Sequence, residues 1–221
     1  MTFASRAIKY FNNLVPSVQA SGAASIINPY STRDVKSCVS LFYKKFYRDN
    51  NKRVFVLGIN PGRFGGGLTG ISFTDPVELK EHCGIDNSLG NQKELSSRFI
   101  YSVVNEYGGT KKFFSKVFLS ALYPFALVKD GKNYNYYDDK RTSGLLRKSI
   151  VENLRSQINF GANRDYVILL GKKNAEYFNS LNDEFNFFKK IFVLEHPRYI
   201  MQYRLKHMHN YIRKYIETIE Q

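Results

Sequence analysis

The sequence predicts a single α/β domain over residues 1–221, with a four-stranded parallel sheet and helices on both faces. Two observations predict it: four short apolar runs rich in β-branched residues, and helical patterns that lie between those runs. The chain has no obvious linker, and 43% of its residues are hydrophobic. A chain of this length and composition can bury a sizeable core.

The four apolar runs do not alternate with polar residues, which is typical of strands buried on both faces of a sheet. In chain order these predicted strands are Val54–Gly58, Val117–Ala121, Tyr166–Gly171 and Ile191–Glu195.

A predicted helix precedes each strand, and another closes the chain. These helices are Arg33–Asp49, Lys93–Tyr107, Arg141–Phe160, Lys172–Leu181 and Tyr203–Ile219. This alternation favours parallel pairing of the strands. Two long segments without a helical or strand pattern, residues 61–91 and 128–140, are predicted to be functional loops.

The net charge of +14 indicates a polyanionic partner, with nucleic acid favoured over an anionic membrane. Basic residues alternate with aromatic ones in residues 43–48 and 199–203, a mixture suited to phosphate contact and base stacking. The alternative interpretation is a basic surface over an aromatic-rich core.

No run is long and apolar enough to span a bilayer, and the first residues lack a secretory pattern. Two cysteines, Cys38 and Cys83, make neither a disulfide framework nor an iron–sulfur set. We therefore expect a monomeric cytoplasmic protein that associates with the nucleoid and uses no metal or other cofactor.

Polar residues followed by proline come after the first and fourth strands. Asn60 stands before Pro61 in a glycine-rich turn, and His196 stands before Pro197. The carboxyl ends of parallel strands meet at one edge of a sheet, where ligands bind. A histidine alone is more often structural, but this placement favours a catalytic pair of Asn60 and His196.

Other kinds of functional site lack residues that they require. No Gly-Lys-Ser/Thr follows the triple glycine at 65–67, so a phosphate loop is excluded, and the proline and long loop exclude a dinucleotide fingerprint. His207 and His209 would point in different directions from a helix and are interpreted as surface residues. Asp75 and Glu78 are interpreted as helix-start or solvated acids, and no hydrolase nucleophile elbow is present.

The first motif is similar to that of the single-strand-selective monofunctional uracil-DNA glycosylases. It consists of Gly58-Ile59-Asn60-Pro61-Gly62-Arg63-Phe64-Gly65 followed by Thr69-Gly70-Ile71-Ser72-Phe73. His196-Pro197 resembles the second motif of the wider uracil-DNA glycosylase superfamily. The resemblance covers about residues 26–205 and implies the four-stranded parallel sheet of that superfamily.

The resemblance implies a role for each matching residue. Asn60 would position the attacking water, and His196 would donate toward uracil O2. The base pocket would be formed by Gly58, Ile59 and Gly62, with Phe73 stacked on the flipped base. The segment after Pro197 would enter the duplex, with Arg198, Tyr199, Ile200 and Met201 as candidates. Arg63, Lys172 and Lys173 are further candidate DNA contacts, the two lysines because they open a helix beside the site.

One departure concerns base recognition. The family reads the uracil edge with an asparagine three residues before a proline, and Ala121 stands at that position here. Either Asn133 or Asn135 from the next loop substitutes for it, or specificity is relaxed toward another deaminated base such as xanthine. The second motif also has Arg198-Tyr199 in place of the usual Ser-Pro, which indicates a divergent bacterial subgroup.

The residues support this chemistry independently. A histidine donor can stabilise a leaving base anion, and Asn60 can hold water but is too weak a base to ionise it. Neither motif contains a lysine for Schiff-base lyase chemistry. The sequence thus predicts a monofunctional DNA glycosylase that removes uracil and initiates base excision repair. One alternative is a non-catalytic nucleic-acid-binding module on the same fold. The other is a phosphate-binding hydrolase that uses the glycines at 65–67, and the missing lysine and metal-binding acids count against it.

Overall fold

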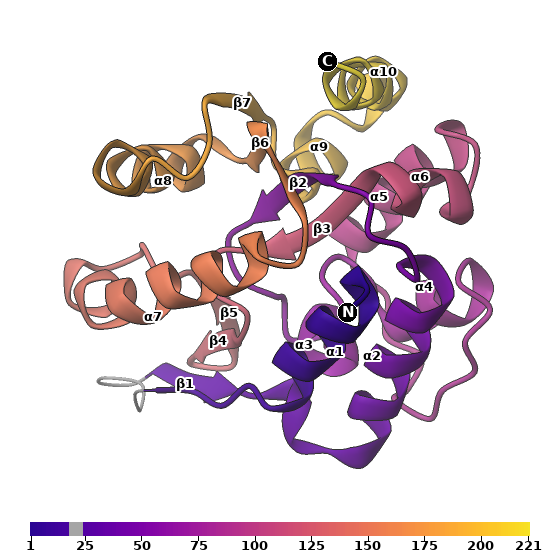
Figure 1. Cartoon of the computed structure of the whole chain (residues 1–221), viewed down its shortest axis with the longest axis horizontal. Coiled ribbons are helices and arrows are strands. Elements are labelled where there is room, and N and C mark those ends of the chain that lie inside the picture. The colour runs from indigo at the N-terminus through magenta and orange to yellow at the C-terminus, as the bar shows by residue number, and fades with distance from the viewer. Residues whose placement is uncertain (18–23) are drawn as a thin grey trace.

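The computed structural model describes residues 1–17 and 24–221, and its centre is a four-stranded parallel sheet (Figure 1). The strand order is β3-β2-β6-β7, with every neighbouring pair parallel. The predicted α/β fold class is confirmed. The strands are β2 (Arg53–Gly58), β3 (Val117–Ala121), β6 (Ala162–Leu170) and β7 (Lys190–Leu194).

One face of the sheet is covered by α1 (Phe3–Asn12), α2 (Arg33–Phe46) and α7 (Lys140–Ile158). Phe55 and Phe118 are register partners on this face, with ring centroids 4.8 Å apart. Phe118 also contacts rings from α1 and α2, and the Ser120 hydroxyl donates to Gln157 of α7. Since alternate residues of a strand share a face, these contacts place the three helices together.

The opposite face is covered by α5 (Leu95–Glu106), α9 (Pro197–Tyr203) and α10 (Met208–Ile219), which pack on one another. Tyr166 of β6 donates a 2.7 Å hydrogen bond to the carbonyl of Ile219 at the end of α10. Two more helices flank the sheet, α6 (Thr110–Lys116) beside β2 and β3, and α8 (Lys172–Phe185) beside β6 and β7.

A second sheet was not predicted. It is antiparallel, in the order β1-β4-β5, with β1 (Ala24–Ile27), β4 (Ala126–Lys129) and β5 (Lys132–Tyr134). Strands of three or four residues carry too little periodicity to be recognised locally. The first part of the predicted loop 128–140, up to Tyr134, belongs to the hairpin formed by β4 and β5. The predicted loop 61–91 contains two short helices, α3 (Gly66–Thr69) and α4 (Pro76–Glu81). Short 3-10 turns lie at Pro29–Ser31 and Leu205–His207.

The aromatic residues at the end of α2 and at its C-cap, Tyr47, belong to the core. Tyr43 is 3% exposed and Tyr47 1%, and both rings stack with neighbouring core aromatics. The interpretation of residues 43–48 as a base-stacking surface is therefore wrong, because the aromatic side of that helix faces the sheet. By contrast, Tyr199 and Tyr203 are 40% and 66% exposed.

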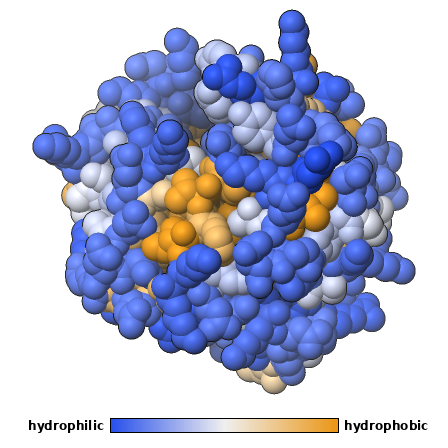
Figure 2. Space-filling model, turned by 90° about the horizontal axis from the view of Figure 1, so that it is seen from above, coloured by the Kyte–Doolittle hydropathy of each residue, from blue (hydrophilic) through white to orange (hydrophobic). Residues whose placement is uncertain are grey.

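The surface is mainly hydrophilic, with a small apolar area near the centre of the view from above (Figure 2). Cys38 and Cys83 are both buried free thiols. Among the described residues, every helix is too short or too polar to cross a lipid bilayer.

Candidate active site

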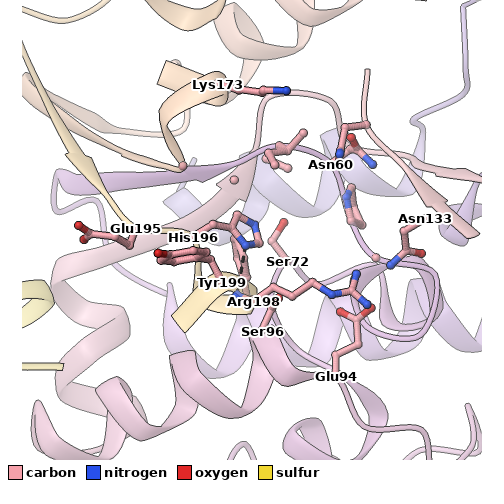
Figure 3. Close-up of a pocket in the computed structure, with 18 of the residues that line it drawn as sticks. Asn60, Ser72, Glu94, Ser96, Asn133, Lys173, Glu195, His196, Arg198 and Tyr199 are labelled. Carbon is pink, nitrogen blue, oxygen red and sulfur yellow. Dashed lines mark hydrogen bonds between the residues drawn. The ribbon is translucent and has the colours of Figure 1, made fainter. Parts of the chain in front are cut away.

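A cavity of about 720 Å³ opens at the carboxyl edge of the parallel sheet (Figure 3). Its volume lies in the range of small-molecule sites. The ends of all four strands contribute to its wall, because the first residues after β2, β6 and β7 and the last of β3 meet there. The predicted site residues that line it are Gly58, Ile59, Asn60, Gly62, Phe73, Asn133, Asn135, Lys172, Lys173, His196, Arg198 and Tyr199.

Asn60 is held by the backbone at the end of β5 and just after it. Its Nδ2 donates to the carbonyl of Tyr134 at 3.0 Å, and its Oδ1 accepts from the amide of Tyr136 at 3.3 Å. These two hydrogen bonds determine which side-chain atom is the oxygen and which is the nitrogen. A carboxamide can make four hydrogen bonds, so an acceptor position and a donor position remain for a ligand or water.

The segment that holds Asn60 is itself tied to the sheet. The hydroxyl of Tyr136 donates to Oδ1 of Asn174 at 2.8 Å, and Nδ2 of Asn174 donates to the carbonyl of Leu57 at 3.1 Å. Tyr136 and Asn174 are fully buried. A buried polar group that loses its hydrogen-bond partner costs free energy of folding. This chain of hydrogen bonds therefore holds the 134–136 segment, α8 and the end of β2 together as one unit.

His196 lies at the opposite side of the cavity as the N-cap of α9. Its Nδ1 accepts a 3.2 Å hydrogen bond from the backbone amide of Arg198. In the neutral ring the proton must therefore be on Nε2, which is left free to donate. Burial, reinforced by the Arg198 guanidinium, lowers the pKa of His196 from 6.5 to about 4. The ring is therefore neutral near pH 7.

This lowered pKa makes a testable contribution to stability. The folded protein disfavours protonation of His196, whereas the unfolded chain binds the proton below pH 6.5. The contribution is therefore complete above pH 6.5 and is lost as the pH falls toward 4, by up to about 3 kcal/mol. We expect the free energy of unfolding, measured with urea, to decrease more from pH 7 to pH 4.5 in wild type than in His196→Gln. Equal decreases would contradict burial of the neutral ring.

Phe73, the last residue of the first motif, forms the wall of the cavity near His196. Its ring centroid lies 6.2 Å from that of His196, and its φ is +56°, unusual for a bulky residue. A Cβ at position 58 would lie 2.5 Å from Cζ of Phe73, so only glycine lets the strand approach the ring. Strain of this kind is found at functional sites, where the surrounding structure maintains it.

The predicted DNA contacts after Pro197 divide into two groups. Arg198 and Tyr199 are exposed and line the cavity. Ile200 is fully buried and Met201 is 7% exposed, because one side of α9 packs on α5. Ile200 and Met201 are therefore core residues, and the prediction that they enter DNA is wrong for this conformation.

The acids and histidines predicted to lie outside the catalytic pair have structural or surface positions. Asp75 is the buried N-cap of α4, accepting from two amides of its first turn, as a helix-start acid should. His207 and His209 are exposed and line neither cavity. Within residues 1–17 and 24–221, no three His, Cys, Asp or Glu side chains are grouped to hold a metal ion.

Among the residues that the sequence analysis missed, Glu94 lines the cavity and Asn174 supports the segment that holds Asn60. Glu94 lines the cavity with its carboxyl group against Gly62, where a Cβ would clash with it, and burial raises its pKa while Arg198 opposes this rise. Its amide donates to Asp75 at 2.8 Å. A glutamate at a helix start and an asparagine one turn into a helix are common, so nothing local singled them out.

Comparison with known proteins agrees with this geometry. The family model described as "Uracil DNA glycosylase superfamily" matches residues 44–220. The chain belongs to the uracil DNA glycosylase superfamily. A solved structure entitled "The crystal structure of WT Pedobacter heparinus SMUG2" is 38% identical, with a TM-score of 0.95, and the match covers 100% of this chain and 97% of that one. A search of curated proteins finds no significant match.

As a member of this superfamily the chain has a DNA glycosylase type of function, with DNA as its partner. The similarity to SMUG2 extends beyond the sheet over the whole chain, and so includes the β4–β5 hairpin that holds Asn60. The matched range 44–220 includes the two strand-end motifs, at 58–73 and 196–197, whose residues line the cavity.

Proposed function

We propose that this protein is a monofunctional glycosylase that hydrolyses the N-glycosidic bond of uracil in DNA and thereby initiates base excision repair. The observation that carries the proposal is the neutral His196, whose free Nε2–H faces the same cavity as Asn60 in a chain of this superfamily. Bacterial SMUG2, the similar solved structure, supports the same assignment.

In the proposed reaction the C1′–N bond breaks and the base leaves as an anion. A neutral histidine donates a hydrogen bond to the base oxygen where charge develops, without transferring its proton. The oxygen of a water held by Asn60 then bonds to C1′, and the water loses a proton to solvent. Phe73 stacks on the extruded base and offsets part of the cost of unstacking it, a few kcal/mol.

Ala121 offers no polar side chain to the cavity, so recognition of the base falls to other residues that line it. Asn133 and Asn135 both line it, but each already has a partner. Oδ1 of Asn133 accepts from the amide of Arg63 at 3.1 Å, and Nδ2 of Asn135 donates to Asp138 at 3.2 Å. Asn133 therefore keeps both of its donor hydrogens free, which suits the oxygen acceptors of uracil or xanthine.

We expect Asn133→Ala to lower uracil release about 10- to 100-fold, since a site that loses a hydrogen bond to its substrate discriminates poorly. Asn135→Ala is the matched comparison from the same loop, and Ala121→Asn should hold or raise the rate. Release of uracil and of xanthine would be measured for each variant. Full activity on both bases in Asn133→Ala and Asn135→Ala would show that the loop does not read the base.

The direct test is incubation with single-stranded and duplex uracil oligonucleotides, followed by alkali to cleave the abasic product. Strand cleavage that depends on both uracil and alkali is expected. Lys172 and Lys173 line the cavity, so a covalent imine must be tested separately. Borohydride should trap no protein–DNA adduct if the enzyme is monofunctional. Unchanged uracil strands would contradict the proposal.

A further inference from the structure

A second, smaller cavity of about 220 Å³ adjoins the first one. The two share four lining residues, Glu94, Ser96, Asn133 and Arg198, so they lie side by side in the region drawn in Figure 3. The remaining wall comes from the first motif, the start of α5 and the β4–β5 hairpin, through Arg63, Phe64, Lys93, Leu95 and Lys132.

The wall of this second cavity is strongly cationic. Arg63, Lys93, Lys132 and Arg198 contribute four positive charges, and the one acid in the wall is Glu94. Across the described parts of the chain, none of the four cations forms an ion pair with a carboxylate. The four cations outnumber this single carboxylate, so the wall carries an excess of positive charge. Such a concave wall attracts an anionic ligand, because the low-dielectric surroundings focus its field.

The same wall offers an aromatic face. Phe64 is 43% exposed, and the Arg63 guanidinium lies 4.4 Å from its ring centroid. Leu95 in the same wall is 39% exposed. An exposed phenylalanine next to unpaired cations is the combination that binds single-stranded nucleic acid, with the base on the ring and the phosphate on the cations.

We propose that the second cavity is a subsite for the nucleotide adjacent to the extruded one, with its base on Phe64 and its phosphate on Lys93 and Lys132. This inference rests on the proposed function only for the position of the target base. The shared wall at Arg198 and Asn133 makes the two subsites neighbours, as consecutive nucleotides of one strand require. The first motif then contributes to both subsites, Asn60 to one and Phe64 to the other.

Binding of a uracil-free single-stranded oligonucleotide tests the subsite without any cleavage. We expect Phe64→Ala to weaken binding about 5- to 150-fold, the range for loss of one stacked base, and Phe64→Trp to restore it. Lys93→Ala/Lys132→Ala should flatten the slope of log K against log salt by up to about 1.4, for two phosphate contacts on a single strand.

The matched control is Lys52→Ala/Lys111→Ala, two exposed lysines that precede β2 and β3 at the far edge of the sheet. It removes the same charge and should leave the binding slope within about 0.3 of wild type. Equal slopes for the two double variants, or Phe64→Ala binding within twofold of wild type, would overturn the subsite. Absence of uracil release would not overturn the subsite, since these binding measurements need no reaction.

The position of the neighbouring base is tested with an oligonucleotide whose single uridine carries a 2′-fluorine and resists cleavage. An abasic spacer is placed on its 5′ or its 3′ side. With the spacer on one of these sides, Phe64→Ala should no longer weaken binding, because no base remains to stack. If Phe64→Ala weakens binding equally with either spacer, Phe64 does not contact the adjacent base and the proposal fails.

Discussion

Replacement of His196 by alanine is expected to reduce the single-turnover rate of uracil release about 10²- to 10³-fold, while DNA binding stays within threefold of wild type. The reason is that a neutral donor aimed at the developing base anion acts mainly in the transition state, and loss of one such donor typically costs this much. His196 has the geometry of such a donor, since the Arg198 amide occupies Nδ1 and leaves Nε2–H free.

His209→Ala is the control for His196→Ala, because that histidine is exposed on α10 and lines neither cavity. Its rate should equal that of wild type. Urea unfolding of His196→Ala would confirm that the variant is folded. It would be measured at pH 8, where neither wild type nor the variant carries a charge at position 196. A rate for folded His196→Ala within threefold of wild type would remove His196 from the proposed mechanism.

Replacement of Asn60 by alanine is expected to reduce the rate by about 10²-fold or more, because a misplaced nucleophile loses the advantage of orientation. The substitution also removes two hydrogen bonds to the 134–136 segment, worth about 1 kcal/mol each. Asn60 could therefore act on the water directly, or only by holding that segment in place.

Tyr136→Phe separates these two roles of Asn60. It breaks the hydrogen bond to Asn174 and loosens the same segment, yet it leaves the Asn60 amide intact. We expect it to lower the free energy of unfolding by about 1–3 kcal/mol, through an unsatisfied Asn174, and to reduce the rate far less than Asn60→Ala does. Similar rate losses in the two variants would assign Asn60 to positioning of the segment rather than of water.

Much of the parallel sheet and the two strand-end motifs could be predicted because their signals are local. Strands buried on both faces must be continuously apolar, so β2 and β3 are visible as runs, and β3 begins and ends where predicted. The carboxyl edge of such a sheet then brings Asn60 and His196 to one cavity, as expected from topology alone.

The wrong predictions concern residues whose side-chain direction depends on packing against segments far away in the sequence. Residues 199–201 follow one another, yet Tyr199 is exposed while Ile200 and Met201 are buried, because α9 packs on α5 across nearly a hundred residues of chain. The basic and aromatic run at 43–48 likewise presents its rings to the sheet rather than to a partner.

The sequence by itself determined the fold class, the superfamily resemblance and the two residues proposed for the chemistry, since each depends on short runs whose meaning is local. Only the tertiary structure decided how those residues are held: the hairpin that orients Asn60, the Arg198 amide that sets the tautomer of His196, and the cationic cavity around Phe64. The physical reason is that orientation, desolvation and concave charge arise from contacts between segments far apart in the chain.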